Sequence, residues 1–158
     1  MRLPNRFGRM GGRDRNLTAI DEKGSKFREY RDMHIRDYFH RIQTLLNRIS
    51  TISTQNITFD ERSEFIGYLT GQITFVDGSR LYLSEYVDVE HTIDKIKYSY
   101  HLMRGSQILF RYDNASDPHA RHLKTYPHHK HTTDGKLVES TTPTLEEVLE
   151  EAINFLQP

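Results

Sequence analysis

The chain has 158 residues, enough for one domain with a single core, and its 22 basic and 22 acidic residues give no net charge. It contains no cysteine, which excludes disulfides and thiolate zinc sites and fits a reducing cytoplasm. No apolar run approaches the roughly 20 residues that span a bilayer. We therefore expect a cytoplasmic protein that does not cross a membrane.

Residues 1–25 are rich in glycine, arginine and asparagine, and they show no apolar period. Five arginines stand in the first twenty residues against one acidic residue. This composition predicts a disordered basic arm, followed by a single α+β domain over residues 26–158. An upstream extension without a role explains the same composition.

The first element of the domain is predicted to be a helix. Apolar residues recur at steps of three and four between Ile35 and Ile52, which indicates an amphipathic helix over residues 27–54. Gly67 and Gly71 in the following strand leave space on its apolar face where this helix can approach. The same apolar stripe would serve a homodimer as well as the core.

Alternating apolar residues then predict a hairpin formed by residues 65–75 and 81–89, with Gly78 in its turn. A three-residue turn pairs Phe75 with Leu81. A turn shorter by one residue would mix the apolar and polar faces, so parity favours the longer turn.

A second hairpin follows over residues 93–114. Pairing Met103 with Gln107 gives it a continuous apolar face. The same register places Lys97 opposite Asp113, which predicts a cross-strand ion pair.

The remaining chain is predicted to contain a short extended piece at residues 123–126 and a helix that begins after Thr144, with Glu147 completing a capping box. If residues 128–131 are extended, His129 and His131 share one face. The predicted fold class is α+β: an N-terminal helix, a four- to five-stranded antiparallel meander sheet and a C-terminal helix.

Five of the nine histidines lie between Tyr112 and His131, interleaved with arginine and lysine. Imidazole transfers protons near neutral pH and also ligates transition metals. The spacing of His129 and His131 occurs in metal sites and also by chance, and Asp113 would be an oxygen ligand nearby. Histidines in a polar loop without any catalytic role remain an alternative.

Metal-free cleavage of RNA by its own 2′-hydroxyl needs a base, an acid and a cation over the transition state. Histidines supply the first two, and arginine or lysine supplies the third. The candidate catalytic residues are His129, His131, Asp113, His128, His122 and His101. The candidate substrate-binding residues are Arg111, Lys130, Lys124, Tyr126 and Arg121. We assign no metal and no cofactor.

The string Arg111-Tyr112-Asp113-Asn114-Ala115, a histidine-containing loop and then Tyr126-Pro127-His128-His129-Lys130-His131 resemble the TumE family of toxin–antitoxin toxins. The preceding hairpin, with Tyr98-Ser99-Tyr100-His101, is similar as well. The resemblance covers about residues 35–156. It implies a small toxin encoded beside a DNA-binding antitoxin, with RNA as substrate and endoribonuclease activity.

Our preferred hypothesis is an RNA-cleaving toxin in which His129 and His131 act as acid and base. In it, Arg111 and Lys130 hold phosphate while Asp113 orients a histidine. The alternatives are a metal-dependent nuclease, a nucleotide-modifying toxin and a non-enzymatic nucleic-acid-binding module. The absence of a glycine-rich phosphate loop argues against the nucleotide-modifying toxin.

Overall fold

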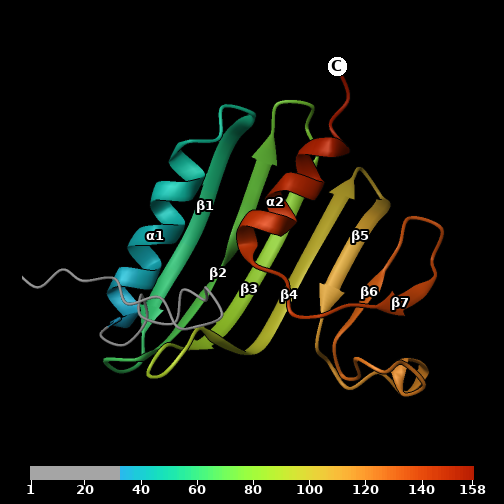
Figure 1. Cartoon of the computed structure of the whole chain (residues 1–158). Coiled ribbons are helices and arrows are strands. Elements are labelled where there is room, and N and C mark those ends of the chain that lie inside the picture. Colours follow the sequence, from blue (N-terminus) through green and yellow to red (C-terminus); the bar gives the residue numbers. More distant parts are fainter. Residues whose placement is uncertain (1–32) are drawn as a thin grey trace, which may run out of the picture.

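The computed structural model describes residues 33–158; the predicted basic arm and the first part of the predicted helix lie outside them. Seven strands form one antiparallel sheet in which each strand pairs with the next along the chain (Figure 1). The elements are α1 (Ile35–Asn47), β1 (Ile52–Glu61), β2 (Ile66–Phe75), β3 (Arg80–Asp88), β4 (Asp94–Arg104), β5 (Gln107–Asp113), the short 3₁₀ helix η1 (Pro118–Ala120), β6 (His129–His131), β7 (Leu137–Glu139) and α2 (Leu145–Asn154). The predicted α+β fold class is confirmed, with seven strands instead of four or five.

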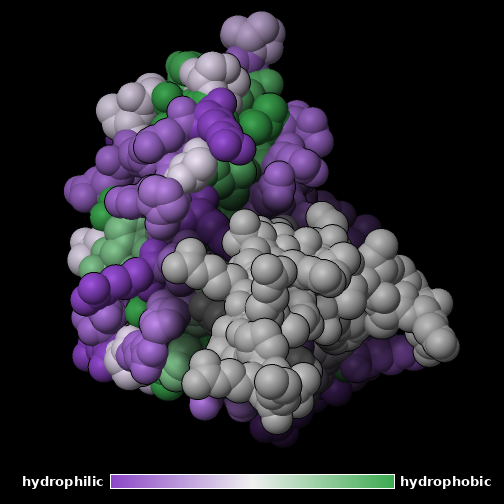
Figure 2. Space-filling view, turned by 60° about the vertical axis from the view of Figure 1, so that its left-hand side comes forward, coloured by the Kyte–Doolittle hydropathy of each residue, from purple (hydrophilic) through white to green (hydrophobic). Residues whose placement is uncertain are grey.

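Both α1 and α2 lie on one face of the sheet, and the core fills the space between them and β2 to β5 (Figure 1). We call this the helix face and the opposite side of the sheet the open face. Seen from the α1 side, the surface is mainly hydrophilic, with hydrophobic residues in smaller patches (Figure 2). Most large apolar side chains of the described residues are buried or partly buried, and the exposed ones are Val76, Tyr82, Ile96, Ile108 and Tyr126.

The predicted first helix extends too far, because α1 ends at Asn47 and β1 begins at Ile52. The periodic pattern continued past the helix because Ile49 and Ile52 also pack against the core from the connecting turn and the start of β1. Apolar residues on a turn that folds back onto the same core mimic another helical turn in sequence.

Two glycines allow close approaches to β2. A Cβ atom on Gly67 would lie 2.4 Å from Phe39 Cζ and 2.5 Å from Ile35 Cγ1, so the helix does rest where the sequence leaves space. A Cβ atom on Gly71 would lie 2.2 Å from the backbone oxygen of Asn56, so Gly71 accommodates β1 and not the helix.

The β2–β3 hairpin has a three-residue turn, as predicted, but one position earlier. Phe75 N donates to Ser79 O at 2.9 Å, and Ile73, not Phe75, is opposite Leu81. The predicted pairing of Phe75 with Leu81 is therefore wrong by two residues. A shift of two leaves every side chain on its predicted face, because side chains alternate with period two.

The predicted pairing of Lys97 with Asp113 is also wrong. Ser99 is the partner of Asp113, and Lys97 is opposite Tyr86 on β3. The β4–β5 turn is shorter than predicted, and the register then shifts because Leu109 is an extra residue in β5. Such a bulge is not visible in an alternating pattern.

The last part of the chain combines one wrong prediction with one that is confirmed. Residues 123–126 are in turns instead of an extended segment. The helix after Thr144 begins with the predicted capping box, in which Glu147 N donates to Thr144 Oγ1 at 3.1 Å and Thr144 N donates to Glu147 Oε2 at 2.8 Å.

Candidate functional site

Strand register arranges the polar side chains of the open face in rows. One row runs across β3, β4, β5 and β6 and contains Tyr82, His101, Arg111 and His131. The next row contains Ser84, Ser99, Asp113 and His129. Because neighbouring strands lie about 4.8 Å apart, side chains in a row are direct neighbours. We call His101, Arg111, Asp113, His129 and His131 the histidine cluster.

Asp113 stands at the centre of the histidine cluster and is 2% exposed. Its Oδ1 accepts a hydrogen bond from Ala115 N at 2.9 Å and lies 3.3 Å from His129 Nε2. Its Oδ2 lies 2.7 Å from Arg111 Nε, although the geometry is not that of a hydrogen bond. The carboxylate thus connects a half-exposed guanidinium to a buried imidazole.

The buried ring of His129 has one nitrogen committed to the backbone. Its Nδ1 donates to the carbonyl oxygen of Pro127 at 2.8 Å, which leaves Nε2 directed at the Asp113 carboxylate. His129 Nε2 and Asp113 Oδ1 are thus two potential ligand atoms 3.3 Å apart. Nitrogen or oxygen atoms of Asp113, His129 and His131 all lie within 4.8 Å of one another, so these three residues could hold a metal ion.

His131 is the histidine of β6 that substrate can reach. Its ring is partly exposed and meets the His129 ring edge-on, with centroids 5.1 Å apart. Within residues 33–158, neither of its ring nitrogens makes a hydrogen bond. Burial lowers its pKa, and the charges of His129 and Arg111 lower it further. Such a group is neutral near pH 7 and accepts a proton.

His101 faces Arg111 from the other side. Burial lowers its pKa, and the positive charges of Arg111 and His131 act in the same direction. Its Nε2 is buried without a hydrogen-bond partner in the described part of the chain. The Tyr82 ring lies beside it, with centroids 6.4 Å apart.

Two predicted residues, Lys130 in β6 and His128 just before it, point to the helix face instead. Lys130 Nζ donates to Glu151 Oε1 on α2 at 2.6 Å and lies 4.9 Å from the centroid of the Tyr112 ring. His128 stacks on Tyr98 at 5.8 Å and 10°, and its Nδ1 lies 3.0 Å from the Tyr98 hydroxyl. Strand alternation separates both side chains from the histidine cluster.

The loop between β5 and β6 carries the other predicted residues, Arg121, His122, Lys124 and Tyr126, all of which are exposed. Among the described residues, none of these side chains forms a hydrogen bond or an ion pair with the histidine cluster. Tyr82 was not among the predicted site residues. The alternation of side chains along β3 was the available signal, because it places Tyr82 on the open face, opposite His101.

The fold and the cluster together define a small α+β protein with a histidine–arginine–aspartate centre on the uncovered face of a meander sheet. A family model described as Toxin TumE matches residues 39–157, well over half of the chain. The chain therefore belongs to the TumE toxin family. No curated protein and no solved structure gives a significant match. In residues 33–158, no helix is both long and apolar enough to cross a membrane.

Proposed function

We propose that the protein is a toxin that cleaves RNA by attack of the RNA's own 2′-hydroxyl, with His131 and His101 transferring protons on either side of Arg111. The observation that carries this proposal is the row itself, in which a guanidinium stands between two partly exposed imidazoles. Guanidinium is suited to phosphate because it offers parallel N–H donors and a permanent charge.

In the proposed reaction, a nitrogen of His131 takes the proton of the 2′-hydroxyl while the 2′-oxygen attacks phosphorus. The bond from phosphorus to the 5′-oxygen breaks, and protonated His101 gives its proton to that oxygen. The products are a 2′,3′-cyclic phosphate and a free 5′-hydroxyl. A bound phosphate raises the pKa of an adjacent imidazole, which supplies the proton on His101 once substrate is present. Arg111 stabilises the extra negative charge of the transition state.

Asp113 and His129 act as positioning residues in this proposal. The buried carboxylate of Asp113 holds Arg111 Nε at 2.7 Å, and His129 supports the ring of His131. His129 is 1% exposed, so its ring cannot reach a phosphodiester in this conformation. The proposal therefore moves proton transfer from His129 to His101.

The test is cleavage of RNA by the purified full chain in EDTA, with the ends analysed by treatment with phosphatase and kinase. We expect cyclic phosphate ends, and we expect His131→Ala and His101→Ala to lower the rate by about 100-fold or more. His122→Ala, an exposed loop histidine, is the matched control and should keep full activity. Activity that survives both cluster substitutions would refute the proposal.

A second candidate is a metal-dependent nuclease, and the ligand atoms of Asp113, His129 and His131 within 4.8 Å of one another favour it. His129 Nδ1 is fixed by a carbonyl oxygen, which is how proteins orient metal-binding imidazoles. Cleavage abolished by EDTA and restored by Zn²⁺ or Mn²⁺, with 5′-phosphate ends, would establish this candidate. In that case Asp113→Asn should lose metal binding measured by calorimetry.

Membership of a toxin family implies a cognate antitoxin. We propose that this partner is the DNA-binding protein encoded beside the toxin. Co-expression of that neighbour should abolish growth inhibition by the toxin. Growth inhibition that persists despite a full level of the neighbouring protein would contradict the pairing.

A further inference from the structure

We propose that the open face of β3 and β4 beside the histidine cluster binds single-stranded RNA, with Tyr82 stacking on a base and Arg80 and Lys97 contacting phosphates. This inference rests on the proposed ribonuclease function and adds how the substrate is held. It concerns residues that take no part in the proposed proton transfers.

Tyr82 is the tyrosine in the row that contains the proposed proton-transfer residues. It is 40% exposed, and it occupies the position next to His101 in the row that leads to Arg111 and His131. The Tyr82 and His101 rings are tilted by 52°, so the Tyr82 ring is not covered by a parallel stack with its neighbour. A base on this ring would lie one strand from His101 and two strands from the phosphate-binding guanidinium.

A hollow of about 320 Å³ adjoins this ring and is lined by Gly78, Arg80, Tyr82, His101, Met103 and Gly105. Its volume is at the lower end of ligand pockets in proteins, roughly 300–1,000 Å³. His101 belongs both to this hollow and to the histidine cluster. A nucleotide in the hollow would therefore be continuous with the phosphate to be cleaved.

A second hollow, of about 460 Å³, continues the same face along β3 and is lined by Arg62, Tyr68, Ser84, Tyr86 and Lys97. Tyr86 follows Tyr82 by four residues, which is about 13 Å along a strand. The face thus repeats an aromatic ring and a basic side chain at two positions. Repeated stacking rings beside cations are how proteins hold single-stranded nucleic acid without reading its sequence.

The basic side chains of this face are available to phosphate. Arg80 and Lys97 are exposed, and neither forms an ion pair in the part of the chain that the structure describes. Arg62 differs from them, since its guanidinium lies 2.7 Å from Asp60. We therefore assign the phosphate contacts to Arg80 and Lys97.

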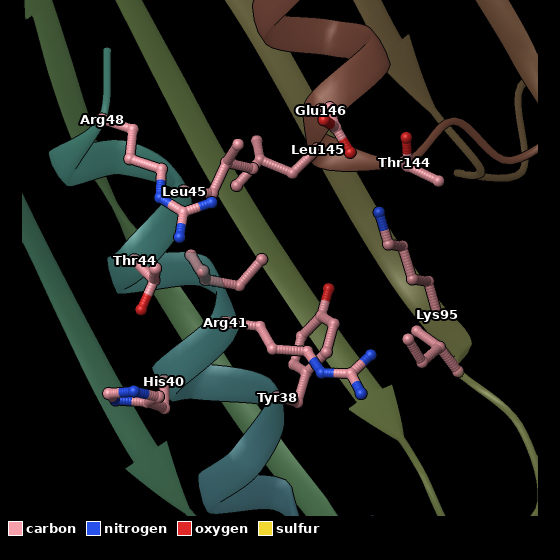
Figure 3. A pocket seen from close by; sticks show the side chains of 12 residues that line it. Tyr38, His40, Arg41, Thr44, Leu45, Arg48, Lys95, Thr144, Leu145 and Glu146 are labelled. Atoms are coloured by element: carbon pink, nitrogen blue, oxygen red, sulfur yellow. The ribbon is translucent and has the colours of Figure 1, made fainter. Parts of the chain in front are cut away.

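The helix face offers a larger hollow of about 500 Å³, lined by Arg41 of α1, Leu145 of α2 and Arg48, which directly follows α1 (Figure 3). The sheet separates this hollow from the histidine cluster, because the hollow lies on the helix face and the cluster lies on the open face. RNA bound there would not present a phosphodiester to Arg111.

The stacking surface of the open face must also receive unpaired bases, which favours single strands over a duplex.

The test is binding of a short fluorescein-labelled single-stranded RNA to the full chain carrying His131→Ala, followed by fluorescence anisotropy. We expect Tyr82→Ala to weaken binding about tenfold and Tyr82→Phe to retain it, because stacking on one base is worth roughly 1–3 kcal/mol. Lys97→Ala should weaken binding and reduce the salt dependence by about one phosphate contact. Arg48→Ala, at an exposed basic residue that lines the hollow of the helix face, is the matched control and should bind as tightly as its parent.

Unchanged affinity in Tyr82→Ala and Lys97→Ala, or equal loss in Arg48→Ala, would overturn this inference. A duplex that binds as tightly as the single strand, or no binding of RNA at all, would overturn it as well. The ribonuclease proposal fails separately. Binding that depends on Tyr82 without cleavage by the unsubstituted chain removes the reaction but leaves the binding surface.

Discussion

The buried pair of Glu85 and Lys95 allows a stability prediction that also separates the helix face from the site. Glu85 is fully buried and accepts hydrogen bonds of 2.5 Å from the hydroxyl groups of Tyr38 and Tyr100. Lys95 Nζ lies 3.3 Å from Glu85 Oε1 and donates to the carbonyl oxygen of Pro143 at 2.8 Å. These contacts join α1, the sheet and the segment that leads into α2.

The substitutions are Glu85→Gln, Lys95→Met and the two together. At 3.3 Å and an effective dielectric constant of about 20, the pair attraction is on the order of 5 kcal/mol. Removing one partner of such a pair costs about 3–5 kcal/mol, because the other charge stays buried without compensation. Burial lowers the pKa of Lys95, although Glu85 opposes this shift, so we expect the lower end of that range.

We therefore expect each single substitution to lower the free energy of unfolding by about 3 kcal/mol, and the melting temperature by roughly 10 °C. The double substitution should cost clearly less than the sum of the two, because it leaves no unpaired charge. Urea unfolding followed by circular dichroism measures all four proteins of this cycle.

Lys136→Met is the control, since it breaks an exposed ion pair of 3.1 Å with Asp134 and should leave the unfolding midpoint unchanged. Additive effects of Glu85→Gln and Lys95→Met would refute the reasoning. RNA cleavage by Glu85→Gln, assayed well below its melting temperature, should equal that of the unsubstituted chain. A specific loss of activity in the folded protein would mean that the pair contributes to the site.

Three further predictions follow from individual residues. Burial and neighbouring positive charges lower the pKa of both His101 and His131, so kcat/KM should rise as the base loses its proton and fall as the acid does, with its maximum on the acidic side of neutrality; a maximum on the alkaline side contradicts the proposed pair. Lys130→Met should lower stability in urea without changing the cleavage rate, whereas Arg111→Lys should lower the rate without comparable unfolding. Gly67→Ala should destabilise the fold by about 1–3 kcal/mol in the same urea assay through its clash with Phe39; wild-type stability would mean that α1 moves freely.

The alternation of residues along the strands predicted which side chains share a face of the sheet more reliably than it predicted which residues pair across strands. His129 and His131 do share one face of β6, while Lys130 and His128, the residue before β6, point to the other side of the sheet. The sequence could not indicate which of these faces the helices cover. Lys130 was therefore expected beside Arg111, although α2 supplies its partner, Glu151, on the opposite side of the sheet.

Short elements could not be predicted from the sequence, because they contain too few residues to show a period. Three residues of β7 complete the sheet through pairing with β6, and a three-residue run carries no alternation of its own. β1 has ten residues, but only Ile57 and Phe59 in its second half alternate toward the core. Its first half was hidden because Ile52 continued the helical pattern.

The histidine cluster forms because one extra residue in β5 brings the side chains that follow it to the open face. With Arg104 opposite Gln107, an uninterrupted ladder would place Arg111 opposite Tyr100, on the helix face. The extra residue Leu109 shifts the pairing by one, so that Tyr100 meets Tyr112 and His101 meets Arg111. A one-residue shift transfers every following side chain to the other face of a sheet. Arg111 and Asp113 therefore reach the open face through this bulge, which is where the proposed chemistry needs them.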